Sequence, residues 1–386
     1  MRLDGFAAAQ RAHVVRAKGG YDAFVPPPLP PAVELSPALA RRLSSADRAL
    51  GELAGMARTV ANPELLSHTM MRREAVLSSR IEGTRSSLPD LVLFEVEQPS
   101  GAGSDDAREV YNYLAALDHL IAPDRRYPVS LPLLKQAHAL LFDSVRGADL
   151  ATPGEFRRSQ NWIGAPGSLL ADAAYVPPPP EQLWSCLDAL EKYLHVRHEL
   201  PPLLILAAVH YQFEAIHPFL DGNGRIGRLL VILLLVEWRL LPAPLLDLSA
   251  YIEPRRDRYY DGLLNVSTRG DWPNWFAFFL EAVEEQARDA VRRAARLQAL
   301  RDDYRARVAT ARSSGLLGLL VDEVFRVPGL TIGRARDVLG VTHRAAALTI
   351  EKLVAAGILT EVAGRARPRL FIAAGILEVL DGSGGD

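Results

Sequence analysis

The chain is poor in cysteine: among its 386 residues only Cys186 carries a thiol. A single thiol excludes an internal disulfide and a cysteine-based zinc cluster, and it fits a reducing compartment. Neither sign of charge dominates, because 44 basic and 46 acidic residues leave a formal net charge of −2. The overall charge therefore gives no reason to expect binding to nucleic acid or to a membrane, and any such site must be local.

Long hydrophobic runs are also missing. The longest, LLVILLLV, is far shorter than the roughly 20 apolar residues that a membrane-spanning helix needs. The first residues, MRLDGFAAAQRAHVV, contain charge within four positions and no apolar core segment, so no secretory signal is expected. We expect a cytoplasmic protein without membrane association. The composition is that of a globular protein, and the length suggests two or three domains at roughly 100–200 residues each.

Helical patterns cover most of the chain and predict a mainly α protein. Residues 1–106 begin with an arm that contains the proline run FVPPPLPP, which is too stiff for a helix. A helical region follows, in which NPELLSHTMMRREAVLSSRIEG predicts one helix over about 63–82. Asn62 is its expected N-cap, Pro63 its first helical residue, and Gly83 the residue just past its end.

Residues 107–290 form the largest predicted unit, an almost all-helical core. Its one clear interruption, TPGEFRRSQNWIGAPGSLLADAAYVPPPPEQ, contains short extended pieces between glycines and prolines and predicts a hairpin or a long loop. Residues 291–311 read as a charged linker helix. Residues 312–376 read as three helices followed by two strands, the layout of a winged helix-turn-helix. Residues 377–386 are expected to be a flexible tail.

The loop HPFLDGNGRIGR, residues 217–228, lies between two of the most apolar helical stretches. Gly222 and Gly224 allow the backbone to approach a ligand and to turn its N–H groups inward. A helix that begins just after them points its positive end at the same place, which favours an anion. Arg225 and Arg228 share one face of the first turn and can bind phosphate oxygens bidentately.

Two further residues of this loop suggest chemistry on that anion. One carboxylate beside phosphates is the usual way of holding Mg²⁺, and Asp221 could supply it. His217 is the only group in the loop that takes up a proton near neutral pH. A histidine near a helix end is usually structural, and glycines in loops are common. Their combination within residues 217–228 nevertheless indicates a phosphoryl- or nucleotidyl-transfer site with its own base.

The loop resembles the motif H-x-F-x-D/E-G-N-G-R-x-x-R of Fic-domain proteins at every fixed position. This resemblance implies a Fic core over roughly 107–290 with a short β-hairpin flap. It also implies transfer of AMP from ATP to a tyrosine, threonine or serine hydroxyl of a target protein, with Mg²⁺, release of pyrophosphate, and self-modification. By position His217 would deprotonate the hydroxyl, Asp221 would hold Mg²⁺, and Phe219 would anchor the loop. Phosphate oxygens would be bound by Gly222, Asn223, Gly224, Arg225 and Arg228.

The segment SSRIEGT, at the end of the predicted helix 63–82, is the second candidate. Ser78 and Glu82 are four residues apart and share a helix face. A carboxylate in the last turn faces the negative end of the helix dipole, at a cost of about 0.3–1 kcal/mol, so Glu82 is either a tolerated exposed residue or has a cationic partner. The segment resembles the Fic inhibitory motif S/T-x-x-x-E-G/N. This implies that Glu82, followed by Gly83, pairs with Arg228 and blocks productive placement of the γ-phosphate.

Two segments of the core are weaker candidates. TPGEFRRSQNWIGA lies where Fic proteins carry the flap that docks the target by strand addition, with Arg157 and Asn161 as contributors. A plain surface loop is the alternative. RRDRYYDGLLNVSTRGDWPNWFAFFL resembles the helical region that borders the adenine, where Tyr259 or Tyr260 would stack on the base. Aromatic residues in a helix are, however, more often part of the core.

The C-terminal part suggests a partner of a different kind. THRAAALTIEKL would be the recognition helix of the winged helix, and its wing would carry Arg365, Arg367 and Arg369. Basic residues outnumber acidic ones here, which favours contact with nucleic acid. Winged helices also mediate protein contacts and dimerisation, so DNA, another protein and a homodimer remain open.

Two interpretations of the whole chain follow. The first is an adenylyltransferase inhibited by its own Glu82, with close variants that use UTP or GTP or that remove AMP with Glu82 orienting water. The second is a DNA-binding regulator whose Fic core is a sensor or scaffold. A scaffold needs none of the polar loop residues, which favours the enzyme. Two measurements distinguish these interpretations: turnover of a nucleotide is expected of the enzyme, and salt-dependent binding to DNA is expected of the regulator.

Overall fold

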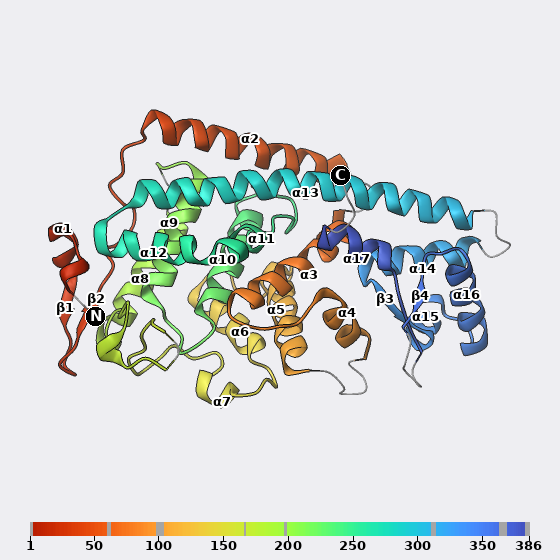
Figure 1. Ribbon diagram of the computed structural model, residues 1–386, viewed down its shortest axis with the longest axis horizontal. Helices are drawn as coiled ribbons and strands as arrows, with labels where there is room; N and C mark the ends of the chain where they lie inside the picture. Colours follow the sequence, from red (N-terminus) through yellow and green to blue (C-terminus); the bar gives the residue numbers. More distant parts are fainter. Residues whose placement is uncertain are drawn as a thin grey trace. The chain divides into compact units, whose positions relative to one another are not determined.

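The computed structural model describes residues 3–59, 63–97, 104–165, 167–196, 199–309, 314–362 and 369–382. The chain is mainly helical with a few short antiparallel strands, as predicted (Figure 1). It divides into two compact units. Unit 1 consists of Met1–Gly51, Asn112–Leu240 and Leu248–Gln286, and unit 2 of Glu52–Tyr111, Leu241–Asp247 and Ala287–Asp386. Within the described residues no helix combines the length and the hydropathy that crossing a bilayer would require.

Unit 1 begins with four short elements: η1 (Leu3–Gly5), α1 (Ala8–Arg11), β1 (Val14–Arg16) and β2 (Asp22–Phe24). The two strands pair antiparallel, with Val14 opposite Phe24. This hairpin was not predicted, because strands of three residues give too little alternation to be recognised. Residues 25–36 then have no regular structure, as the proline run implies.

The helical part of unit 1 surrounds two buried helices, α9 (Pro202–Ile216) and α10 (Asn223–Glu237). Every residue of α9 from Leu203 to Ile216 is buried, since a helix that is apolar on all sides must be covered on all sides. Helices α6, α8 and α12 pack against this pair, and the loop 217–228 connects its two helices and includes the first turn of α10. The other elements are α6 (Leu131–Leu141), α7 (Ala148–Ala151), η3 (Leu170–Asp172), α8 (Pro180–His195), α11 (Ser249–Ile252), η4 (Glu253–Arg255) and α12 (Arg256–Arg269). Helix α5 (Asp105–Ile121) belongs to unit 1 from Asn112 onwards and to unit 2 up to Tyr111.

The predicted hairpin flap is reduced to a loop with a single antiparallel bridge. Ile163 and Tyr175 exchange two backbone hydrogen bonds of 2.9 and 3.1 Å, and no ladder extends from them in the described part of the segment. Glycines and prolines on both sides of the bridge remove the donors and the side chains that a longer ladder needs. The N-terminal hairpin packs on this loop through an apolar cluster of Val15, Tyr21, Ala23, Leu170, Ala173 and Val176.

Two long helices extend across the division between the two units. Helix α2 (Pro37–Thr59) and helix α13 (Trp272–Val308) each belong to both units. The predicted boundary at residue 290, between the core and the linker helix, falls inside α13, which is continuous. A change in composition along a helix therefore did not mark a break in its backbone.

Unit 2 combines helices from both halves of the chain with one small sheet. Its elements are α3 (Pro63–Ile81), α4 (Leu88–Glu97), α14 (Ser314–Arg326), β3 (Gly329–Thr331), α15 (Ile332–Leu339), α16 (His343–Ala355), β4 (Thr360–Glu361), β5 (Leu370–Ile372) and α17 (Ala374–Asp381). The strand order is β3-β5-β4, all antiparallel. Helix α3 confirms the prediction over 63–82 to within one residue, although Asn62 lies outside the described residues. Arg365 and Arg367, which the sequence pattern assigned to a wing, also lie outside them.

The predicted flexible tail 377–386 is wrong in its first half. Residues up to Asp381 belong to α17, which buries Ile376, Leu377, Val379 and Leu380. These side chains pack against α3 and α4, segments that the chain forms far earlier. A short apolar stretch bounded by glycines therefore becomes a helix through distant partners rather than through its own propensity.

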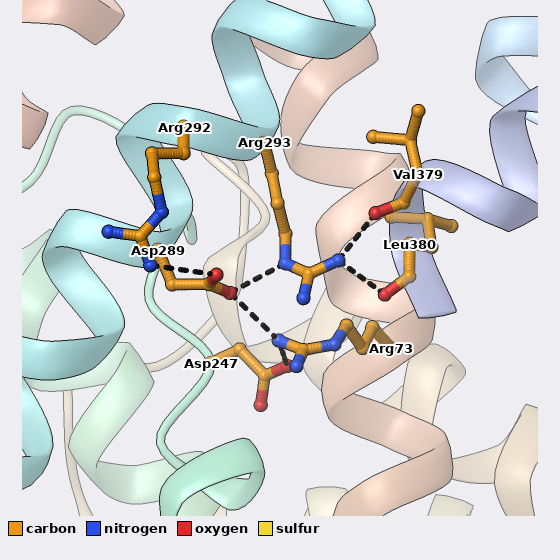
Figure 2. Close-up of polar contacts among 7 residues, drawn as sticks. All are labelled: Arg73, Asp247, Asp289, Arg292, Arg293, Val379 and Leu380. Carbon is orange, nitrogen blue, oxygen red and sulfur yellow. Dashed lines mark hydrogen bonds and ion pairs between the residues drawn. The ribbon is translucent and has the colours of Figure 1, made fainter. Parts of the chain in front are cut away.

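A polar network in unit 2 links α3 to the last helix (Figure 2). Arg73, on α3, is 2.7 Å from Asp247 and 3.5 Å from Asp289 on α13. Asp289 also accepts from Arg293, whose guanidinium donates to the carbonyl of Leu380 at 2.6 Å. A cation at the end of α17 compensates its last unsatisfied carbonyl groups. The helix that carries the predicted inhibitory segment is therefore built into the same unit as the C-terminal helix.

Candidate active site

His217 ends α9 in a left-handed conformation, with φ 50° and ψ 60°. Such a backbone is uncommon for a residue with a side chain, and here it turns the chain out of the buried helix. Nδ1 of His217 lies 3.2 Å from the carbonyl oxygen of Glu214. Because a carbonyl only accepts, Nδ1 carries the hydrogen and the lone pair is on Nε2. The nitrogen that can take up a proton is therefore Nε2.

The backbone of the loop is held by the two residues predicted to dock a target. Arg157 is 3% exposed, and its Nε donates to the carbonyl of His217 at 2.9 Å, while its backbone N–H donates to that of Pro218. Burial lowers the pKa of Arg157 to about 10, so it stays charged at neutral pH. Asn161 donates to the carbonyls of Phe219 and His217 at 2.8 and 3.2 Å. Both donors therefore stabilise the loop, and docking of a target by this segment stays a prediction.

Phe219 and Asn223 lock the middle of the loop. Phe219 is fully buried, as predicted, and its ring stacks on that of His138 with centroids 3.9 Å apart and an angle of 5°. The side-chain amide of Asn223 accepts from the N–H of Phe219 and donates to its carbonyl, both at 2.8 Å. The sequence suggested that Asn223 binds phosphate. Here its side chain is used inside the loop, so its backbone N–H is the group left to face an anion.

The loop ends at the N-terminus of α10, where the predicted anion site lies. Gly222 precedes the helix with φ 77°, and a Cβ at this position would lie 2.7 Å from a ring carbon of Phe142. Only glycine fits both constraints. The first N–H groups of α10, from Asn223 and Gly224 onwards, have no partner within the helix and make its end positive. An anion is the ligand that such an end favours.

Two arginines add positive charge to this helix end. Arg225 and Arg228 are 4% and 2% exposed, and the guanidinium of Arg225 lies over the ring of Phe142 at 5.2 Å. Guanidinium groups beside the N-terminus of a helix add to the positive potential there, and one oxygen of Asp221 lies 3.8 Å from Arg225. Guanidinium groups can also bind the oxygens of a polyphosphate bidentately.

Asp221 is the one carboxylate of the loop, and its side chain is 67% exposed. One oxygen accepts from the N–H of Gly222 at 2.5 Å and lies 3.8 Å from Arg225. Among the described residues no cluster of three or more histidine, cysteine or acidic side chains could hold a metal ion. Mg²⁺ is usually bound by one or two carboxylates with water and substrate phosphates, so a single exposed carboxylate beside an anion site fits it.

The two tyrosines proposed to stack on adenine have different environments. Tyr259 is 1% exposed and its hydroxyl lies 2.8 Å from Nε2 of His210, so its ring belongs to the core. Tyr260 is 44% exposed. Of the two tyrosines, only Tyr260 therefore remains a predicted stacking residue for the adenine. Burial, and secondarily the charge of Arg228, lowers the pKa of His210 to about 3.

His138 is a residue of this site that the sequence did not reveal. It lies on α6, is 0% exposed, and has Nε2 3.1 Å from the carbonyl of Asp221. Burial lowers the pKa of His138 to about 4, so its ring is neutral. A lone histidine in an apolar helix such as LPLLKQAHALL usually indicates only a core position, and the partner lies 83 residues away in sequence.

The neutral histidines predict a loss of stability in mild acid. Because His138 and His210 have folded pKa values of about 4 and 3, below the unfolded value of about 6.5, the unfolded chain binds more protons between these limits. The free energy of unfolding therefore falls as the pH drops below about 6.5, by about 1.4 kcal/mol per histidine at pH 5.5. Urea unfolding at pH 7 and 5.5 measures this. His138→Gln should lose about 1.4 kcal/mol less than wild type, and an equal loss in the two proteins would contradict the assignment.

The predicted inhibitory segment lies at the C-terminal end of α3. Ser78 is fully buried, α3 ends at Ile81, and Gly83 has φ 109° with its N–H donating to the carbonyl of Arg80. Glu82 therefore lies in the turn just past the helix, and not in the last helical turn where the sequence pattern placed it. Its pairing with Arg228 stays a prediction.

Two family models match this chain. Residues 40–121 match the model described as Fic/DOC family N-terminal, and residues 128–235 match the model described as Fic/DOC family. The second match contains the whole loop 217–228, and the first contains the segment with Ser78 and Glu82. The two segments singled out in the sequence thus lie inside the two matched regions.

Curated relatives cover part of the chain. Protein adenylyltransferase Fic of Drosophila yakuba is 32% identical over 134 residues, which are 34% of this chain and 24% of the relative. Protein adenylyltransferase Fic of Culex quinquefasciatus is 28% identical over 210 residues, which are 53% of this chain and 38% of the relative. The chain therefore matches less than half the length of either relative.

Solved structures resemble the fold. A Fic family protein from Desulfovibrio desulfuricans G20 aligns with a TM-score of 0.58 at 20% identity, covering 89% of this chain and 98% of that one. Fic-1 from C. elegans aligns with a TM-score of 0.51 at 19% identity, covering 67% and 74%. At these identities the likeness concerns the arrangement of helices.

Proposed function

Because this chain is a Fic-domain protein, we propose that it transfers the AMP part of ATP to a tyrosine, threonine or serine hydroxyl of a target protein and releases pyrophosphate. One observation carries the proposal. The bond from Nδ1 of His217 to the carbonyl of Glu214 leaves the lone pair on Nε2, in a loop that leads directly to the positive end of α10. The naming of curated relatives as adenylyltransferases supports the same reaction.

Different residues of the loop accept the proton and bind the phosphate groups. Nε2 of His217 takes the proton of the target hydroxyl as its oxygen attacks the α-phosphorus of ATP. The bond from this phosphorus to the oxygen that bridges to the β-phosphorus breaks, and pyrophosphate leaves. The N–H groups at the start of α10, with Arg225 and Arg228, bind the phosphate oxygens whose charge grows in the transition state.

Asp221 would hold Mg²⁺ together with phosphate oxygens of the substrate. The ion, when bound, neutralises charge on the departing pyrophosphate and orients the chain of phosphates. The chain's own part is to present one carboxylate at a fixed place, which it does through the hydrogen bond from the N–H of Gly222.

The test is incubation of the protein with ATP labelled at the α-phosphate and with Mg²⁺, alone and with a cell extract. Label on the protein itself or on an extract protein is expected, and label from the γ-phosphate is not. Transfer from labelled UTP or GTP in place of ATP would change the nucleotide but keep the chemistry. Hydrolytic removal of AMP from a labelled protein, without any forward transfer, would replace the proposed transfer by a hydrolysis in which Glu82 orients the attacking water.

We also propose that Glu82 inhibits the transfer by pairing with Arg228. The support is the position of Glu82 at the end of α3, directly before Gly83, within a region that matches the Fic/DOC N-terminal family model. A carboxylate on Arg228 would occupy the guanidinium that otherwise binds the γ-phosphate, so that ATP binds without reaching a productive position.

For residues 312–376 we propose a winged helix that contacts DNA. Supporting this are the packing of α15 against α16, the three-stranded antiparallel sheet, and the exposed Arg344 and Lys352 on α16. A fluorescent DNA duplex should bind with an affinity that falls steeply between 50 and 200 mM salt. Arg344→Ala with Lys352→Ala should weaken binding and flatten this salt dependence, whereas Arg41→Ala should not. Salt-independent or absent binding would favour a protein contact or a homodimer through this unit.

A further inference from the structure

One imidazole ring joins three segments of unit 1. Nδ1 of His138 lies 2.9 Å from the backbone nitrogen of Gly154, and Nε2 lies 3.1 Å from the carbonyl oxygen of Asp221. An N–H can only donate and a carbonyl can only accept, so Nδ1 has the lone pair and Nε2 has the hydrogen. A single neutral tautomer of His138 satisfies both contacts. The face of the same ring stacks on Phe219.

Each of these partners matters to the candidate site. Asp221 carries the exposed carboxylate, and Phe219 is the buried anchor of the loop. Gly154 begins the segment that leads to Arg157, whose side chain holds the carbonyl of His217. With φ 76°, Gly154 also lies close on α6, since a Cβ there would be 3.3 Å from the carbonyl oxygen of Lys135. The loop and the start of the flap segment are therefore fixed to one side chain.

The rest of α6 supports the same loop from the same side. Phe142, one turn after His138, lies under Gly222 and under the guanidinium of Arg225. The end of α6 is itself secured, because the side-chain amide of Asn112 donates to the carbonyl of Asp143 at 2.8 Å. The end of α6 is thus a fixed surface against which the loop packs. His138 makes the polar contact between this surface and Asp221, the residue that carries the carboxylate.

We propose that His138 is a positioning residue for the transfer of AMP. Its two hydrogen bonds fix the backbone of Asp221 relative to the flap segment, and they thereby fix the direction of the Asp221 carboxylate. This inference rests on the proposed function. Residues that orient a metal-binding group through a hydrogen bond typically contribute 10–100-fold in metal affinity or activity. Loss of this contact should therefore raise the Mg²⁺ concentration required and lower the rate, while the triphosphate site at α10 stays in place.

Three substitutions separate the contacts of the ring. His138→Gln places an amide where Nε2 stands and keeps a donor for the carbonyl of Asp221. His138→Asn reaches only the position of Nδ1 and keeps an acceptor for Gly154. His138→Phe keeps the stack on Phe219 and loses both hydrogen bonds. His119→Gln is the matched control, because His119 also bonds a neighbouring helix, through Gln136, but lies outside the loop's contacts.

The expected order is specific to a positioning role. His138→Gln should retain transfer within about fivefold, and His138→Asn and His138→Phe should lose about 10–100-fold and need more Mg²⁺. Hydrogen exchange gives a readout besides activity: the amide of Gly154 should exchange faster in His138→Gln and His138→Phe than in His138→Asn. ATP binding without Mg²⁺ should stay unchanged in all of them.

Two results would overturn the proposal. One is His138→Phe with an unaltered Mg²⁺ requirement and unaltered exchange at Gly154. The other is an equal loss in all three variants together with a lower unfolding temperature and the wild-type Mg²⁺ requirement, which indicates packing alone. If wild type transfers no nucleotide, the proposed function fails, and Mg²⁺-dependent nucleotide binding and the exchange at Gly154 still decide whether His138 positions Asp221.

Discussion

His217→Ala should lower transfer of AMP by about 10²–10⁴-fold, the usual contribution of a positioned general base. The physical reason is specific to one atom. Nδ1 of His217 is bound to the carbonyl of Glu214, so Nε2 is where the proton of the target hydroxyl is received, and alanine removes it. The fold should persist, because the carbonyl of residue 217, which Arg157 and Asn161 hold, belongs to the backbone.

Initial rates of label transfer from α-labelled ATP measure this effect, with circular dichroism and the affinity for ATP as checks on the fold. His119→Ala is the control for loss of a histidine elsewhere in unit 1. Residual transfer within about tenfold of wild type would remove His217 from the role of base. Loss of ATP binding together with transfer would instead point to a disturbed loop, and His217→Asn would then be the variant to measure.

Glu82→Gly should raise transfer, including modification of the protein by itself. If Glu82 occupies Arg228, its removal frees the group that binds the γ-phosphate, and a coupling of about 1–3 kcal/mol gives a 5–150-fold increase. Glycine should be accommodated at this position, because residue 82 follows Ile81, the last residue of α3, and so lies outside the helix. The gain should be lost again in the combination with His217→Ala.

The measurement is the same label transfer, at saturating ATP, for wild type, Glu82→Gly and Arg85→Gly. The last variant alters the same turn without removing a carboxylate, so it should behave as wild type. An unchanged rate in Glu82→Gly, with unchanged ATP affinity, would refute inhibition by this residue. An increase in both glycine variants would assign the effect to a loosened turn.

The candidate site could be predicted where its chemistry is local. Residues 217–228 contain a base, a carboxylate, glycines and arginines in one continuous loop, so the sequence alone brings them together. The start of α10 after Gly222 followed from the same pattern. The use of each side chain was harder to predict. Asn223 binds the backbone of Phe219 within the loop, a contact that depends on the fold of the turn and not on composition.

The residues missed by sequence reasoning are those that act over long separations. His138 meets Asp221 only because α6 packs against α10, and the pattern of α6 by itself fits an ordinary core helix. Dependence on distant partners also explains which elements of the fold were predicted from the sequence and which were not. Long periodic helices such as α3 were predicted to within a residue, whereas α17 and the hairpin β1–β2 depend on surfaces that other segments provide. Short elements contain too few residues for periodicity to identify them.

The assembly of unit 2 has a consequence for the order in which the protein is made. Helix α3 packs against α14 and α17, and its Thr69 donates to the carbonyl of Phe325 at 2.7 Å. Chains are synthesised from the N-terminus at about 5–20 residues per second. A ribosome therefore completes the loop 217–228 and helix α6, against which the loop packs, before it reaches residue 314. During that interval the helix that leads to Glu82 lacks two of its packing partners. A nascent chain, or one cut before α14, therefore contains the entire loop while the helix that is expected to restrain it has not yet been docked.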